Sequence, residues 1–107
     1  MEDIYRGDTF KFDIAAELEE GIPYTFQKGD IIKVGMKASL AQSKCNLFKK
    51  IVVEEATDTI PVAFSHEEMM KCCEGIKLLE AELTDTEGNV KTLFQEKVKI
   101  VGDLINE

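Results

Sequence analysis

Three cysteines and one histidine are the residues with the most chemical potential. Cys72 and Cys73 are adjacent and follow His66 closely, whereas Cys45 lies far from them in the chain. A tetrahedral zinc site favours ligands spaced as in CxxC and needs a fourth ligand, and a Cys–His nucleophile pair needs a third group to orient it. Neither pattern is present. We therefore predict no catalytic residue, no metal ligand and no cofactor.

The odd number of cysteines has no framework spacing, which suits a reducing compartment. We predict that Cys45, Cys72 and Cys73 are reduced thiols that form no disulfide.

Paired carboxylates offer a second kind of chemistry, because two acids that converge in a cleft can act as general acid and base. Acids are common in this chain, with 21 Asp and Glu against 13 Lys and Arg, so a solvated surface explains these pairs better. The pairs are Glu54 with Glu55, Glu67 with Glu68, and Glu80 with Glu82. We therefore expect that the protein is not an enzyme.

Arg6-Gly7-Asp8 matches a tripeptide that some cell-adhesion receptors bind. A structural role is the better interpretation, because Gly7 permits a tight bend and Asp8-Thr9 is typical of the start of a strand. We place no receptor site there.

Composition limits the classes of partner. The 107 residues suffice for one domain, and a net charge of -8 argues against nucleic acid, which binds through Lys and Arg. No apolar run approaches the roughly 20 residues that span a bilayer, so membrane insertion is not expected. The acidic start Met1-Glu2-Asp3 lacks the charge of a secretory signal peptide.

Apolar residues alternate with polar ones in several runs, which predicts strands with one buried face. The central run extends from Ile32 to Leu40, and similar runs surround Phe12, Val62 and Ala81. We predict a core of Phe12, Ile14, Val34, Met36, Val62, Leu79, Ala81, Leu83 and Ile100. Residues 47–54 also favour a strand, but Phe48 and Val52 have the opposite parity to Leu47, Ile51 and Val53, which leaves the buried face open.

Turn residues separate these runs at Glu20 to Pro23, at Lys28-Gly29-Asp30 and at Asp85 to Asn89, the last as the loop of a hairpin. Gly35, inside the central run, indicates a bulge or a close packing point. Seven or so short strands with frequent turns predict an all-β, antiparallel sandwich.

One helix, at about residues 66–74, interrupts the strands. Ser65 and Glu68 have the spacing of a capping box, and Gly75 follows where a helix commonly ends. In the strand that follows, the core parity leaves Ile76 and Leu78 on the other face, beside Glu80 and Glu82. Either the helix covers these two residues or they form a protein interface.

The chain resembles the N-terminal immunoglobulin-like domain of phage baseplate upper proteins and its small prophage relatives. Two segments carry the resemblance: Arg6 to Phe10 with Gly21-Ile22-Pro23-Tyr24, and the run from Gly75 to Leu83 with Asp85, Gly88, Val90, Thr92 and Leu93. The chain departs from the family at Lys77 and Leu79, where aromatic residues are usual. The resemblance implies that residues 1–107 form one immunoglobulin-like sandwich domain.

The resemblance also implies a non-enzymatic structural module of a phage or prophage tail, which binds other tail or baseplate proteins or further copies of itself. Such a protein would be made in the bacterial cytoplasm and would be incorporated into the tail of the virion. A carbohydrate- or cell-surface-binding sandwich is the alternative, although the chain has no Trp and only two Tyr for an aromatic platform.

Overall fold

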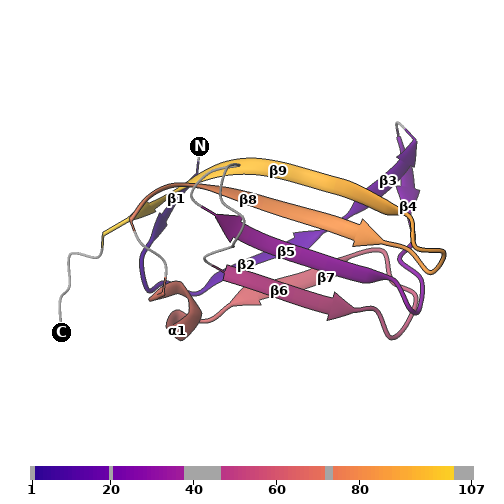
Figure 1. Ribbon diagram of the computed structural model, residues 1–107, viewed down its shortest axis with the longest axis horizontal. Helices are drawn as coiled ribbons and strands as arrows, with labels where there is room; N and C mark the ends of the chain where they lie inside the picture. The colour runs from indigo at the N-terminus through magenta and orange to yellow at the C-terminus, as the bar shows by residue number, and fades with distance from the viewer. Residues whose placement is uncertain (1, 20, 38–46, 72–73, 103–107) are drawn as a thin grey trace.

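The computed structural model describes residues 2–19, 21–37, 47–71 and 74–102. These residues form strands and one short helix (Figure 1). The elements are β1 (Glu2–Tyr5), β2 (Phe10–Ile14), β3 (Ala16–Glu19), β4 (Ile22–Tyr24), β5 (Ile31–Lys37), β6 (Leu47–Val52), β7 (Ile60–Phe64), α1 (His66–Met69), β8 (Gly75–Thr84) and β9 (Val90–Val101). The prediction of an all-β fold with one short helix is confirmed.

Two layers of strands form the molecule. A five-stranded sheet has the order β1-β9-β8-β5-β6, and the two-stranded sheet β2-β7 packs behind it (Figure 1). The hairpin β3-β4 projects at one end. Buried side chains from both sheets make one hydrophobic cluster, as in a β-sandwich.

One strand pair departs from the predicted antiparallel arrangement. β1 runs parallel to β9, with Ile4 opposite Ile100 and Tyr5 opposite Val101. The sequence did not indicate β1, because only four residues form it and their pattern is too short to show a period. The chain then turns at residues 6–9 and continues as β2 in the other layer. β1 therefore forms one edge strand of the five-stranded sheet, beside β9.

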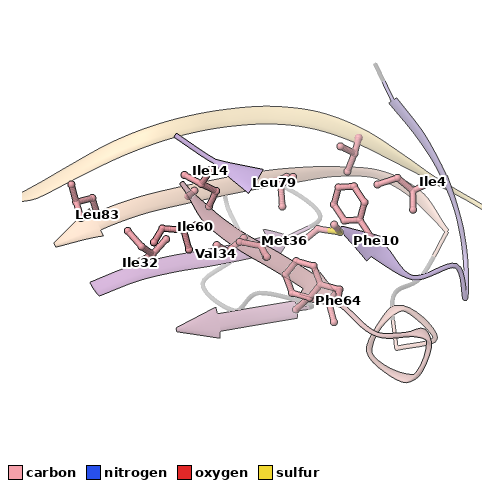
Figure 2. Packing of buried hydrophobic residues seen from close by; sticks show 14 of the residues in the cluster. Ile4, Phe10, Ile14, Ile32, Val34, Met36, Ile60, Phe64, Leu79 and Leu83 are labelled. Atoms are coloured by element: carbon pink, nitrogen blue, oxygen red, sulfur yellow. The ribbon is translucent and has the colours of Figure 1, made fainter. Parts of the chain in front are cut away.

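The core lies between the layers and follows the predicted parity (Figure 2). Val34 lies opposite Ala81, and Met36 lies opposite Leu79, so the alternating residues of β5 and β8 share one face. Among the predicted core residues in the structure, all but one are buried. Ala38 and Leu40 lie outside the described residues.

Phe12 is the exception, because it is only half-buried. Its strand, β2, has a neighbour on one side alone, so nothing covers the other side of the ring fully. The ring meets Phe94 of β9 edge to face, with the centroids 6.1 Å apart.

The capping box of α1 is confirmed. The Ser65 hydroxyl accepts the backbone N–H of Glu68, and the Glu68 carboxylate accepts the backbone N–H of Ser65. The helix itself is shorter than predicted: it ends at Met69, and the N–H of Lys71 already bonds to the carbonyl of Glu68 in a tighter turn. Its one buried residue, Met69, closes an end of the core.

The turn containing Arg6-Gly7-Asp8 docks on this helix. The guanidinium of Arg6 donates to the carbonyl of Met70 at 3.0 Å, and Nδ1 of His66 donates to the carbonyl of Gly7 at 2.5 Å. Gly7 has a φ of 93°, which a side chain would strain. The predicted bend is confirmed, and both Arg6 and Gly7 have structural contacts.

At the opposite end of the core, Asp30 holds the turn before β5. Its buried carboxylate accepts the phenol of Tyr24 at 2.6 Å and the backbone N–H of Gln27 at 2.9 Å. The hydrogen bond to Asp30, with partial desolvation, raises the pKa of Tyr24 to about 12. The turn predicted at Glu20 to Pro23 is shorter than expected, because Ile22 and Pro23 already belong to β4.

The hairpin between β8 and β9 has the predicted loop. Oδ1 of Asp85 accepts the N–H groups of Glu87 and Asn89, both at 2.9 Å, and Gly88 has a φ of 90°. These bonds, led by the one from Asn89, lower the pKa of Asp85.

Candidate functional site

The most prominent surface is the side of the five-stranded sheet that faces away from β2 and β7, which we call the outer face. The register of the strands places Ile76, Leu78, Glu80 and Glu82 of β8 there, because Leu79, Ala81 and Leu83 point into the core. It is a face without a covering layer among the described residues (Figure 1).

Large apolar side chains gather on the outer face. Seven large hydrophobic residues are exposed in the described part of the chain, and the strand parity puts five of them there. These five are Tyr5, Phe48, Val52, Ile76 and Val90. They are spread over β1, β6, β8 and β9, and their gathering on one face favours contact with a partner there.

The two predicted interface residues both lie on this face. Ile76 is 53% exposed and Leu78 is half-buried. The alternative, in which the helix covers them, fails for Ile76: α1 directs Met69 into the core instead. Ile76 is therefore free to contact a partner.

Charged residues surround the apolar ones in a regular pattern. Leu78 has Lys37 and Lys97 as its cross-strand neighbours, and Lys33 lies directly opposite Glu82. Glu80 accepts a hydrogen bond from the Gln95 side chain at 2.8 Å. The face thus combines apolar contacts with charges of both signs, a combination typical of protein interfaces.

Gly35 forms the floor of a shallow hollow of about 150 Å³ on the outer face. Phe48 borders it on β6, Glu80 borders it on β8, and Lys33 and Lys37 flank it. Of the two alternatives predicted for Gly35, a bulge or a close packing point, the bulge is wrong, because the register with β6 and with β8 shows no shift at Gly35. The missing side chain leaves room for a group from outside.

The sequence did not identify Phe48, Val52, Tyr5 or Val90 as surface residues. A signal was available for two of them, since Phe48 and Val52 have the opposite parity to Leu47 and Ile51. The structure decides the question: Leu47 is buried, and Phe48 is 57% exposed.

The outer face offers apolar and charged groups for association. Among the described residues it holds no Cys, His or Ser. In the described part of the chain no three His, Cys, Asp or Glu residues form a metal-binding group. The predictions for Cys45, Cys72 and Cys73 concern residues outside those that the structure describes.

One pair of carboxylates, Glu80 and Glu82, lines the hollow above Gly35 together with Lys33 and Lys37. Glu54 and Glu55 are exposed after β6, whereas Glu80 and Glu82 lie on the outer face. Glu68 caps α1 and meets Lys49 at 3.1 Å. Its hydrogen bond from the Ser65 N–H and the nearby Lys49 ammonium lower the pKa of Glu68.

Compared with protein-family models, with curated proteins and with solved structures, the chain matches none of them. Function is therefore inferred from the surface itself. The one helix that the structure describes is too short to cross a membrane.

Proposed function

We propose that this protein is a non-enzymatic structural module of a phage or prophage tail, which joins other tail or baseplate proteins through the outer face. The outer face is the observation that carries the proposal: five large apolar side chains are exposed on one sheet, and Lys and Glu residues lie among them. Such a surface buries well against a complementary sheet or helix.

The strand order supports the immunoglobulin-like part of the proposal. Immunoglobulin sandwiches have Greek-key connections, so some strands that are distant in sequence pair within a sheet. Here β5 pairs with β8 in one sheet and β2 pairs with β7 in the other, while β8 and β9 are consecutive. The resemblance to baseplate upper proteins rests on the sequence segments and is what suggests the tail.

The test changes apolar residues of the outer face to glutamate. In separate variants, Ile76→Glu and Phe48→Glu alter exposed positions, so the fold should survive. We expect the parent chain to form a dimer or a larger assembly at high concentration, or to bind a neighbouring tail protein, and each variant to lose at least about tenfold in affinity. Light scattering measures the self-association, and titration calorimetry measures the binding to the tail protein.

Ile22→Glu is the matched control. Ile22 is 49% exposed, but it lies on the β3-β4 hairpin rather than on the outer face. It should leave association unchanged. If both outer-face variants associate like the parent, the outer face is not the contact. Genes for tape-measure or baseplate proteins beside its gene would support the tail assignment separately.

Carbohydrate or cell-surface binding is the second candidate, and the hollow above Gly35 is the observation that favours it. The exposed ring of Phe48 next to Lys33 and Glu80 resembles the aromatic and polar pairing on which a sugar ring stacks. A glycan array probed with the parent and with a Phe48→Ala variant tests this candidate function. A glycan that binds the parent but not the variant would favour it.

A further inference from the structure

The two-stranded sheet has two unpaired edges, one on β2 and one on β7. An unpaired edge offers a row of backbone N–H and C=O groups to another strand. The two edges differ in whether those groups remain available.

The edge of β7 is closed. Pro61 has no N–H to offer, and the carbonyl of Ala63 accepts a hydrogen bond from Nζ of Lys49 on β6. In an antiparallel pair, alternate residues direct both backbone groups to the same side. Pro61 and Ala63 therefore direct theirs away from β2.

The same alternation fixes the orientation of β2. Lys11 pairs with Ala63, and Asp13 pairs with Pro61, so these are the pairs without mutual hydrogen bonds. The backbone N–H and C=O groups of Lys11 and Asp13 thus point to the open edge. No backbone partner from the described residues reaches them there.

A groove of about 310 Å³ runs along this open edge. Every residue of β2 lines it, so it follows the strand rather than one of its faces, and no residue of β7 takes part. Leu93 and Phe94 of β9, both half-buried, form its apolar wall together with Phe12.

We propose that this groove binds one extended segment of a partner protein, which adds to β2 as an antiparallel strand. The segment would bond with the free backbone groups of Lys11 and Asp13 and would cover Phe12 and Phe94. This is strand addition, in which main-chain bonds give affinity and side-chain pockets give specificity. It does not depend on the outer face.

The occupant is a single strand rather than a second copy of the domain. If β2 paired with β2 of another copy in an antiparallel manner, both five-stranded sheets would lie on the same side of the joined sheet. We expect each β9 to clash with the other copy, because Leu93, Phe94 and Glu96 of β9 already line the groove. A segment one strand thick avoids this clash.

Charge specifies the segment further. Lys11 and Asp13 are both exposed on the face of β2 that points away from the core. An antiparallel partner should place an acid opposite Lys11 and a base opposite Asp13, with apolar residues between them that face Phe12. From its N-terminus, the segment therefore reads apolar, basic, apolar, acidic, apolar.

The probe is a capped peptide of sequence Thr-Ile-Lys-Val-Asp-Ile-Thr, added to the isotope-labelled full chain. In the free chain, we expect the amides of Lys11 and Asp13 to exchange with deuterium faster than those of Phe12 and Ile14, which bond to β7. The peptide should slow the exchange of Lys11 and Asp13 and shift the signals of Phe94.

Two modified peptides test the geometry without changing the protein. N-methylation of the peptide's Lys or Asp blocks an N–H that faces β2 and should weaken binding at least about tenfold, whereas N-methylation of its Val, which faces away, should not. Exchanging the Lys and Asp of the peptide should weaken binding about fivefold.

Three results would overturn the proposal. The first is protection of the Lys11 and Asp13 amides in the free chain, which would mean that the edge is already paired. The second is equal binding by all the N-methylated peptides. The third is a Kd above about 1 mM for the unmodified peptide, or signal shifts confined to the outer face.

Discussion

Leu78 and Leu79 are neighbours on β8 with the same side chain, yet they lie on opposite faces of the sheet. Leu79 is 2% exposed and lies opposite Met36 within the core. Leu78 is half-buried between Lys37 and Lys97 on the outer face. The two faces of β8 therefore have different roles. The inner leucine contributes to stability, and the outer leucine is available for association.

The same division holds for the two faces as a whole. The inner face of β5 has only apolar residues, Ile32, Val34 and Met36, all buried. Its outer face has Ile31, Lys33, Gly35 and Lys37, and the neighbouring strands expose Phe48 and Ile76. The inner face has its apolar partners within the chain, whereas no layer of the described residues covers the outer face.

Substituting the two leucines tests this division most directly. We expect Leu79→Ala to lower the free energy of unfolding by about 2–5 kcal/mol, because it removes buried methyl groups and leaves a cavity. Leu78→Ala should cost about 1 kcal/mol or less. Urea denaturation followed by circular dichroism measures both, and equal losses would contradict the division between the faces.

The helix cap gives the next largest effect. Ser65→Ala removes the acceptor for the N–H of Glu68 at the end of the core that Met69 closes. We expect a loss of about 1 kcal/mol. Thr92→Ala, which removes a hydroxyl from the outer face, is the control and should change stability by less than about 0.5 kcal/mol. Thermal unfolding compares the two, and a control loss as large as that of Ser65→Ala would count against a special role for the cap.

Tyr24 and Tyr5 extend the comparison to alkaline pH. Tyr24 bonds to Asp30 beside the core, whereas Tyr5 is exposed on the outer face. In a Tyr5→Phe chain, absorbance should show the remaining phenol ionising with a pKa of about 12 instead of 10. A midpoint near the ordinary value would mean that the bond to Asp30 is absent in solution.

The raised pKa of Tyr24 also predicts a pH dependence of stability. Because the folded state holds the phenol proton more tightly, this contribution is complete below pH 10 and is lost as the pH rises to about 12. Tyr24→Phe should lack this component of alkaline destabilisation, which denaturation at a series of pH values would show. Tyr5→Phe should retain it.

The smallest effect is expected at Glu68. Its pKa is lowered by the hydrogen bond from Ser65 and by Lys49, so its contribution is present at neutral pH and is lost as the pH falls below 4.5, the ordinary value. The effect should be small, because an exposed ion pair contributes at most about 1 kcal/mol. The Glu68→Gln variant should lose slightly less stability than the parent as the pH falls below 4.5. Glu82→Gln, on the outer face, should lose as much as the parent.

Local patterns predicted much of the fold correctly. The alternation in β2, β5, β7 and β8 identified the core, and Ser65 with Glu68 identified the helix start. The same parity argument placed Ile76 and Leu78 on the outer face. These features succeed because the period of a strand and the spacing of a capping box depend only on nearby residues.

The rest required long-range partners. The exposure of Phe48 depends on which side of β6 meets the other sheet, and the half-burial of Phe12 depends on the missing neighbour of β2. β1 pairs with the far end of the chain, which no local period encodes.

The sequence by itself therefore determined β2, β5, β7 and β8 with their buried parity, the capped start of the helix and the hairpin at Asp85, since each follows from contacts within a few residues. Tertiary structure alone decided the parallel pairing of β1, the hollow over Gly35, and the contrast between the closed edge of β7 and the open edge of β2. The physical reason is that Lys49 reaches Ala63, and Phe94 reaches Phe12, only after the sheets have packed.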